Sequence, residues 1–325
     1  MKKRAVFVLL IIMIAATSAF AQGKTYQLRT STNLAGAGTI GKGLAYFVDI
    51  VNKQSGGRIK AVANFGAELG SQSEQVEMAR TGSLEMVVSA PGTGPGTWVP
   101  QLMMFEFPFL FKNNDHYLRV LKGLEAEVST LVKPYGFIAT AGQSMGSRHM
   151  LTKKPVTKLE DIANMKMRGP NAVYISMFKS LGAAGTTMDW NEIYSALQTG
   201  VIDGMEASPS MINSMKFQDV AKNLTITDHI IACVYYFFNE KWFNALPQDL
   251  QKIVMDCAQE AAQYQAELDE ADQVASMEKI KAAGVAIHEL KDKAKWIDAC
   301  KPMLNDYRAK GKAWNDFIDK MLAIQ

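Results

Sequence analysis

Residues 165–209 read MKMRGPNAVYISMFKSLGAAGTTMDWNEIYSALQTGVIDGMEASP, and this stretch decides the fold class. In Met165–Arg168 apolar and charged residues alternate, which predicts a short strand with one buried face. Pro170 stands where a first helical turn would begin, and apolar residues follow it at helical spacing. A helix is therefore expected to start beside Arg168.

A second helix is predicted further along the same stretch. Asp189 followed by Glu192 is a variant of the capping box, and apolar residues then mark one helical face. Gly200 ends this helix, and residues 201–204 resume as a strand. The order strand, helix, strand, helix, strand predicts an α/β unit whose helix N-termini and strand ends gather on one edge.

Arg168, at the end of the first strand, is the leading candidate for a binding residue. The first N–H groups of a helix have no partners within the helix, and the helix dipole favours negative charge there. A guanidinium beside such a helix start adds two parallel donors for a carboxylate. The pattern predicts an anion site. The alternative is that Arg168 is an exposed residue paired with a surface Glu or Asp.

The first residues of the chain are typical of a secretory signal. Met1–Arg4 is basic, residues 5–16 are apolar, and Ala19-Phe20-Ala21 has the small-x-small pattern of a cleavage site. We expect cleavage of residues 1–21 and secretion of the mature chain. A retained membrane anchor is the alternative, but the apolar run is shorter than the roughly 20 residues that span a bilayer.

Charge and metal-ligand patterns exclude several classes of function. Cleavage removes three of the 35 Lys and Arg residues, and the remaining 32 equal the 32 Asp and Glu residues in number. Without a basic tract, nucleic acid is not an expected partner. The His and Cys residues are scattered outside the spacings of metal sites. We therefore expect no metal and no cofactor. Cys233, Cys257 and Cys300 allow at most one internal disulfide, and the sequence assigns none.

Gly142-Gln143-Ser144-Met145-Gly146 matches G-x-S-x-G, the nucleophile elbow of hydrolases. An elbow needs a helix directly after the serine, whereas Arg148–Leu151 has the pattern of a strand. We expect no enzymatic activity, and a secreted serine hydrolase that uses Ser144 is the alternative.

The start of the mature chain alternates strands and helices. Strands are predicted over Tyr26–Thr32, Ile59–Asn64 and Leu84–Ser89, with one helix between each pair. Connections of this kind are crossovers between parallel strands of one sheet. They predict a doubly wound lobe.

The chain is expected to cross into a second lobe around residues 143–146, between strands Phe137–Ala141 and Arg148–Leu151. It is expected to return along residues 226–238, so that two crossings form a hinge. The expected lobes are residues 22–145 with 232–272, and residues 146–231 with 273–325.

A long helix is predicted between Pro247 and Gly284, because no other Pro or Gly occurs there. At 1.5 Å per residue it would run about 57 Å, which exceeds one lobe. The helix must bend or bridge both lobes. A further helix is expected from Asp292 to about Leu322.

Three motifs resemble the solute-binding proteins of tripartite ATP-independent periplasmic (TRAP) transporters: Lys166-Met167-Arg168, the run Glu192–Gly200, and Asp203-Gly204-Met205-Glu206. They occur in that family's order and spacing, and the resemblance covers nearly the whole chain. It implies two doubly wound α/β lobes joined by a hinge, similar to periplasmic binding proteins, with a long helix bridging both.

The resemblance also implies a function. Such a protein captures an organic acid between its lobes and delivers it to the small and large membrane subunits of a TRAP transporter. We expect a monomer. A binding protein of an ATP-driven uptake system is another alternative, since it shares the two lobes but not the long helix.

The resemblance implies roles for individual residues. Arg168 matches the family's main carboxylate-binding arginine, and Trp190 matches an aromatic residue that packs against the ligand. Arg148 can give a second contact to the acid, or can form a structural pair with a local carboxylate. Weaker candidates on lobe-one loops expected to face the cleft are Asn33, Glu68 and Trp98.

This chain departs from the resembling family at one point. Many of its sugar-acid binders have a Glu-Asn-Pro run, whereas this chain has Glu206-Ala207-Ser208-Pro209. The Ala207 methyl cannot donate a hydrogen bond, so the carboxylate should depend on Arg168 and on Arg148 or Ser208. Space freed at Ala207, beside Trp190, predicts a preference for a carboxylate with apolar surface over polyhydroxylated sugar acids.

Overall fold

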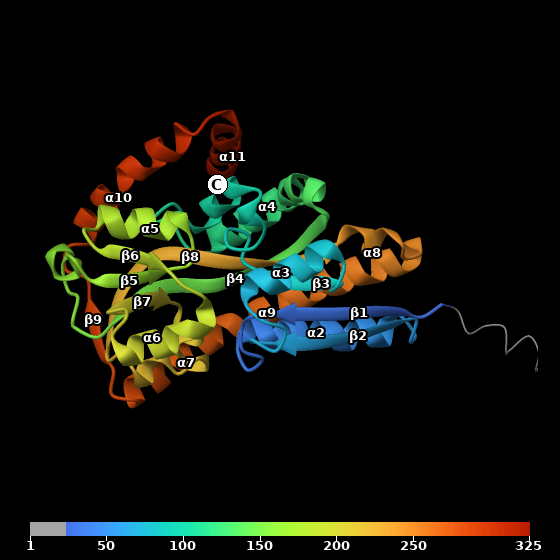
Figure 1. The fold of residues 1–325 in the computed structure, drawn as a ribbon, viewed down its shortest axis with the longest axis horizontal. Helices are drawn as coiled ribbons and strands as arrows, with labels where there is room; N and C mark the ends of the chain where they lie inside the picture. The colour runs from blue at the N-terminus through green and yellow to red at the C-terminus, as the bar shows by residue number, and fades with distance from the viewer. Residues whose placement is uncertain (1–23) are drawn as a thin grey trace, which may run out of the picture.

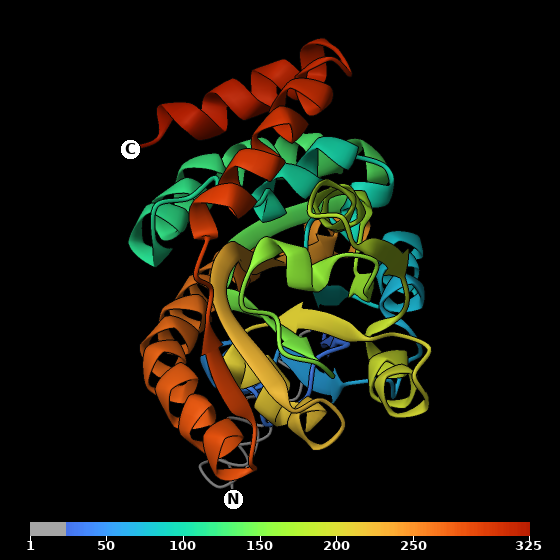
Figure 2. The same cartoon turned by 90° about the vertical axis from the view of Figure 1, so that its left-hand side faces the viewer.

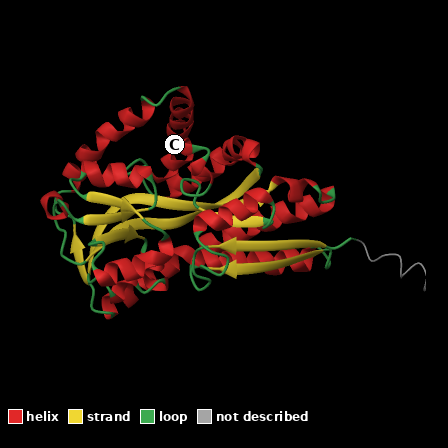
Figure 3. Ribbon diagram, in the orientation of Figure 1, coloured by secondary structure: helices red, strands yellow, loops and turns green. Residues whose placement is uncertain are grey.

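A computed structural model describes residues 24–325, and the expected signal peptide therefore lies outside the described residues. Nine strands form one mixed sheet in the order β2-β1-β3-β8-β4-β7-β5-β6, and β9 pairs with β8 (Figures 1 and 3). Between residues 24 and 325 no helix has both the length and the apolar character required to cross a membrane.

The first lobe is built from strands and helices near the N-terminus of the described chain. Strand β1 pairs in parallel with both β2 and β3, as the crossover pattern predicted. Ser71 caps the second helix, since its Oγ accepts a hydrogen bond from the Glu74 N–H at 3.3 Å. The elements are β1 (Tyr26–Thr32), α2 (Thr39–Gln54), β2 (Ile59–Phe65), α3 (Gln72–Thr81) and β3 (Met86–Ser89).

The second lobe contains the stretch that predicted the fold class. Helix α5 lies on one side of its strands, and α6 and α7 lie on the other (Figure 1). Asp189 and Glu192 form the expected capping box, and Gly200 ends α6 with φ 82°. The elements are β5 (Lys166–Gly169), α5 (Ala172–Ser180), β6 (Ala184–Thr187), α6 (Ile193–Thr199), β7 (Gly204–Ala207) and α7 (Pro209–Ser214).

Two predicted boundaries in this lobe shift by a few residues. Helix α5 is capped by the Asn171 side chain, which accepts from the Val173 N–H at 3.0 Å, so Pro170 precedes the helix. The strand expected from residue 201 begins at Gly204. Pro170 fixes the turn between Arg168 and the helix instead of opening the first helical turn.

Two long antiparallel strands, β4 (Phe137–Thr152) and β8 (Asn223–Asn239), run through both lobes (Figure 1). The prediction of separate strands over Phe137–Ala141 and Arg148–Leu151 was wrong, because β4 is continuous. Its pairing with β8 shifts register between Thr140 and Gln143 and twice more before Met150. Bulges bend a strand without ending its pairing. The chain therefore crosses between the lobes along two bent strands that stay paired.

Helix α9 (Gln248–Ala282) is the predicted long helix. Its 35 residues extend about 52 Å at 1.5 Å per residue. It packs against α2 in the first lobe, α7 in the second lobe and β4 between them. The two doubly wound lobes and the bridging helix confirm the fold predicted from the sequence.

The C-terminal helix predicted from Asp292 to Leu322 is two helices, α10 (Lys293–Arg308) and α11 (Lys312–Ala323). Gly311 separates them with φ 118°, a conformation that other residues rarely adopt. Figure 2 shows α11 above α4 (Asn114–Val132). Helix α10 packs on α5 and α11 on α4, so the C-terminal segment contacts both lobes. The remaining elements are α8 (Glu240–Asn244) and β9 (Ala286–Glu289).

Candidate functional site

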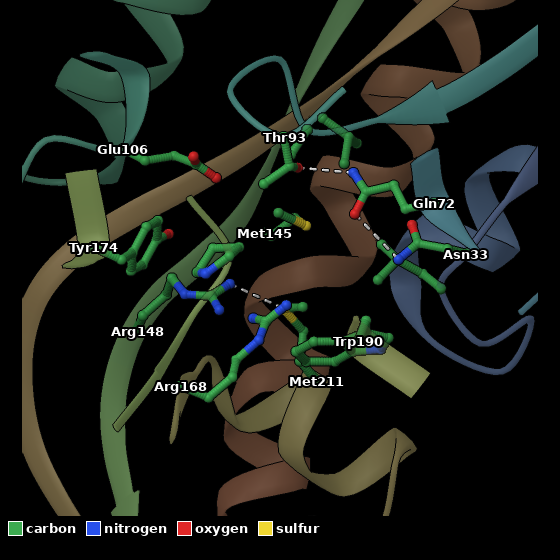
Figure 4. A pocket seen from close by; sticks show the side chains of 14 residues that line it. Asn33, Gln72, Thr93, Glu106, Met145, Arg148, Arg168, Tyr174, Trp190 and Met211 are labelled. Atoms are coloured by element: carbon green, nitrogen blue, oxygen red, sulfur yellow. Dashed lines mark hydrogen bonds between the residues drawn. The ribbon is translucent and has the colours of Figure 1, made fainter. Parts of the chain in front are cut away.

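A pocket lies between the two lobes and encloses about 410 Å³ of empty space, including its opening to solvent (Figure 4). Both lobes supply its walls, so a molecule inside it would contact both. The first lobe contributes Asn33, Gln72 and Thr93. The second lobe contributes Arg168, Tyr174, Trp190 and Met211, and Arg148 and Met145 come from the crossing strand β4.

Arg168 is the last residue but one of strand β5, lines this pocket and is only 5% exposed. Its Nε and Nη2 atoms donate to the Met188 carbonyl at 3.1 and 2.9 Å. Among residues 24–325 no carboxylate forms a salt bridge with it, which excludes the surface ion pair considered from the sequence. Burial lowers the Arg168 pKa to about 10, so the guanidinium stays charged at neutral pH. The pocket thus contains a buried, uncompensated cation.

Arg148 is also buried but is paired. Its Nε and Nη2 atoms donate to the two carboxylate oxygens of Glu206, and Nη2 also donates to the Glu206 carbonyl at 2.8 Å. The remaining nitrogen, Nη1, lies 3.4 Å from the Met211 sulfur at the pocket wall. Of the two roles that the sequence left open for Arg148, the structural pair with a local carboxylate is therefore present. A contact between Arg148 and a ligand remains a proposal.

The Arg148–Glu206 pair keeps both groups ionised. Burial by itself disfavours each charge, but the partner's charge together with neighbouring groups outweighs that effect, so the Arg148 pKa is raised and the Glu206 pKa is lowered. His229 Nε2 lies 3.7 Å from Glu206 Oε2, and burial lowers the pKa of this histidine. The three side chains therefore contribute little net charge to the pocket.

Glu106 is a pocket residue that the sequence analysis missed. It is 2% exposed and ends the 3₁₀ helix Pro100–Glu106, directly before the aromatic run Phe107–Phe111. Asn171 Nδ2 donates to its Oε2, and burial raises the Glu106 pKa to about 7. Glu106 could have been found in the sequence as a single carboxylate beside an apolar run. Buried acids in such positions need a partner or a function.

The first lobe presents a polar wall opposite Arg168 (Figure 4). Gln72 Nε2 donates to Thr93 Oγ1 at 2.8 Å and to Ser89 Oγ at 2.8 Å. Asn33 Nδ2 lies 3.4 Å from Gln72 Oε1, so Asn33 is at the pocket as expected. The sequence analysis missed Gln72 and Thr93, although Gln72 is the first residue of the helix expected between the strands Ile59–Asn64 and Leu84–Ser89. Such amide and hydroxyl groups can both donate to and accept from ligand oxygens.

Trp190 lines the pocket, as the resemblance implied, and is 4% exposed. Its ring meets Phe217 edge to face with centroids 5.2 Å apart, and the Arg168 guanidinium lies 5.7 Å from its centroid. The indole Nε1 is buried without a hydrogen-bond partner among residues 24–325. Trp190 therefore contributes an apolar ring to the pocket wall, beside the Arg168 guanidinium.

Two of the weaker candidates lie outside the pocket. Trp98 was expected to face the cleft, but its ring stacks on Tyr135 at 6.1 Å and lies 5.5 Å from the Arg80 guanidinium. Packing against these neighbours turns it away from the second lobe. Glu68 is exposed, and its Oε2 accepts from the Phe65 N–H at 3.2 Å, which stabilises its own loop.

Ala207 and Ser208 also lie away from the main pocket. Ala207 has no exposed surface and belongs to the apolar core that includes Trp190 and Met205. The expected free space at Ala207 is therefore filled, which removes the structural basis for the predicted apolar preference. Ser208 lines an adjoining pocket between the 34–40 loop and α7, and its buried Oγ has no partner within the described residues.

Ser144 lies inside the continuous strand β4, where the sequence motif suggested a nucleophile elbow. Its hydroxyl donates to Asn114 Oδ1 at 2.6 Å and accepts from the Gly146 N–H at 3.1 Å. No histidine is among its hydrogen-bond partners within residues 24–325. The geometry lacks both the helix and the base that a serine nucleophile needs.

Residues 30–310 match the family model of bacterial extracellular solute-binding proteins, family 7, designated DctP. A solute-binding protein of Verminephrobacter eiseniae strain EF01-2 is 34% identical over 82% of this chain and 81% of its own length.

Two solved structures of TRAP periplasmic solute-binding proteins are similar to this chain. The protein from Sulfitobacter sp. NAS-14.1, with bound β-D-galacturonate, has a TM-score of 0.87 and 27% identity, covering 91% of this chain and 99% of the other. The protein from Polaromonas sp. JS666, bound to D-erythronate, has a TM-score of 0.87 and 25% identity, covering 92% and 99%.

Proposed function

The chain belongs to the bacterial extracellular solute-binding proteins, family 7, and from this premise we propose that it captures an organic acid between its lobes for a TRAP transporter. The two similar structures hold sugar acids, each with one carboxylate and several hydroxyl groups. The pocket of this chain has groups for both features. Arg168 supplies the cation, and Gln72, Thr93 and Asn33 supply the polar wall.

The observation that carries the proposal is the buried guanidinium of Arg168. A buried charge without a compensating carboxylate is costly, and an entering carboxylate would remove that cost. Two donors already hold the Met188 carbonyl, so the side chain is fixed before a ligand arrives. Preorganisation of this kind lowers the entropy lost on binding.

Closure of the lobes is the proposed mechanism of capture. A ligand shifts the protein toward a closed state only by binding that state more tightly. A carboxylate on Arg168 in the second lobe, with its body against Gln72 in the first, would supply such a preference. The irregular pairing of β4 and β8 gives the backbone a place to bend, and α9 ties the two lobes together.

A thermal-shift screen tests the proposed function. The panel contains D-galacturonate, D-erythronate, succinate, pyruvate and lactate, together with glucose as an uncharged control. A ligand at about 100 times its dissociation constant adds roughly 2.7 kcal/mol of apparent stability. We expect at least one acid to raise the melting temperature and glucose to have no effect. A flat response to every acid would contradict the proposal.

The proposal includes the partners and location of the protein. Export to the periplasm by cleavage near residue 21 would place it beside the small and large membrane subunits of the transporter. Mass spectrometry of the protein from a periplasmic extract measures the mature N-terminus. Reconstitution of acid uptake that requires both this protein and the membrane subunits tests the partnership, and we propose no catalytic step.

A further inference from the structure

Four ionisable side chains from different elements face the pocket or lie directly behind it. Arg148 on β4 and Glu206 on β7 form a buried ion pair. Arg168 on β5 and Glu106 at the end of the 3₁₀ helix Pro100–Glu106 have no such ion pair with each other or with other side chains of residues 24–325. The charge of the pocket is therefore set by Arg168 and Glu106.

The Glu106 carboxyl is held in place by one oxygen and presents the other to the pocket. Oε2 accepts from Asn171 Nδ2, and the backbone of the neighbouring loop covers it so closely that a Cβ at Gly92 would lie 2.6 Å away. Oε1 has no hydrogen-bond partner among residues 24–325. Figure 4 shows the carboxyl directed into the cavity, on the side opposite Arg168.

The surroundings of Glu106 offer it little compensation. Arg148, the cation with the stronger effect on Glu106, already binds Glu206 with two nitrogens. The Tyr174 hydroxyl is buried without a hydrogen-bond partner within the described residues. If Glu106 is ionised, it balances Arg168 and repels an entering carboxylate. If Glu106 is protonated, the pocket carries one net positive charge and an O–H donor.

We propose that Glu106 binds the ligand as a neutral carboxylic acid, so that uptake of an anionic hydroxy acid is coupled to uptake of a proton by Glu106. This inference rests on the proposed function and adds a class of ligand to it. The carboxylate of the acid would bind Arg168. A hydroxyl oxygen at the other end would accept a hydrogen bond from the Glu106 carboxyl, beside the free hydroxyl of Tyr174.

The electrostatics of the pocket agree with this geometry. Burial raises the Glu106 pKa to about 7, and the Arg148 and Arg168 charges only partly oppose that effect. The other groups near it are Glu206 on β7, which raises it further, and His229 on β8, whose own pKa is lowered by burial. A bound carboxylate adds another negative charge and raises the pKa of Glu106 again.

The affinity for the acid should depend on pH because the Glu106 pKa is higher in the complex than in the free protein. Glu106 binds more protons in the complex than in the free protein, so the dissociation constant rises as pH increases above about 7. The rise approaches roughly tenfold per pH unit between the free and bound pKa values. At lower pH the carboxyl is already protonated and the coupling disappears.

The first experiment needs no ligand. Protein carrying ¹³C-labelled glutamate is titrated by NMR, and the Glu106 carboxyl signal is assigned by its loss in Glu106→Gln. We expect it to titrate well above the ordinary Glu value, near pH 7. Titration at the ordinary value would overturn the inference whatever the protein binds.

The second experiment measures proton uptake directly. Calorimetric titrations with D-galacturonate and D-erythronate, whose carboxylates stay ionised, are run at pH 7.5 in phosphate and in Tris. The difference in observed heat gives the protons taken up, and we expect roughly half a proton or more for the wild type. Glu106→Gln should bind the acids without taking up protons, and its affinity should not fall from pH 6 to pH 8.5.

The control variant is Glu278→Gln, which removes an exposed carboxylate on α9 far from the pocket. It should keep the proton uptake of the wild type. Proton uptake that persists in Glu106→Gln, or is absent from the wild type, would overturn the inference. Binding of succinate or pyruvate without binding of either hydroxy acid would also overturn it, while leaving the proposed function intact.

Discussion

The Arg148 guanidinium and the Glu206 carboxylate form a fully buried ion pair that joins the crossing strand β4 to β7. The pair neutralises one of the two pocket arginines. Arg168, which lies in the same pocket, has only the Met188 carbonyl as its hydrogen-bond partner among residues 24–325. Arg148 therefore stabilises the second lobe, whereas the Arg168 guanidinium is available to an acidic ligand.

We expect Arg168→Ala to weaken binding of the acid found in the thermal-shift screen by about 30-fold or more, because loss of one partner of a buried charge pair costs about 2–5 kcal/mol. Arg168→Lys should also weaken binding, since a single ammonium cannot reproduce the two parallel donors. Titration calorimetry measures both variants. Wild-type affinity in Arg168→Ala would reject the role assigned to this residue.

Arg148→Ala should act mainly on stability. Removing one partner of a buried ion pair leaves the other charge uncompensated and costs about 3–5 kcal/mol of unfolding free energy. The double variant Arg148→Met with Glu206→Leu should lose less than Arg148→Ala, because no buried charge remains. Urea unfolding followed by circular dichroism measures the three proteins. An Arg148→Ala variant as stable as the wild type would contradict a structural pair.

The stability of the protein should depend on pH through Glu106. Its pKa in the folded protein is raised from 4.5 to about 7. The free energy that this raised pKa adds to the stability of the fold is therefore fully present below pH 4.5 and is lost as pH rises to about 7. This loss amounts to about 3 kcal/mol. Comparison of wild-type and Glu106→Gln unfolding from pH 4 to pH 8 isolates it, because the variant lacks the group. Parallel curves for the two proteins would show that Glu106 has an ordinary pKa.

Ser144→Ala should leave ligand binding unchanged and cost about 1 kcal/mol of stability through loss of the hydrogen bond to Asn114. A panel of ester substrates should show no turnover by the wild type. Turnover that disappears in Ser144→Ala would instead support the hydrolase alternative.

Local patterns were sufficient for most of the fold. The capping box at Asp189, the Gly200 helix end and the long run between Pro247 and Gly284 each act over a few residues, and each appears in the structure where it was expected. Breaks in a strand were harder to predict. The sequence predicts an interruption between two strands at residues 143–146. In the structure β4 stays extended there, because its pairing with β8 resumes at Gln143 after a bulge.

The sequence by itself determined the α/β class, the family resemblance and the position of Arg168 at a strand end beside a helix start. These follow from periodicity, capping and motifs, which involve residues close together in the chain. Only the tertiary structure decided which charges are compensated. Arg148 and Glu206 are 58 residues apart, and Glu106 and Asn171 are 65 apart, yet each pair is in contact. Burial and pairing across such distances set the charge of the pocket, because they depend on which strands the fold places side by side.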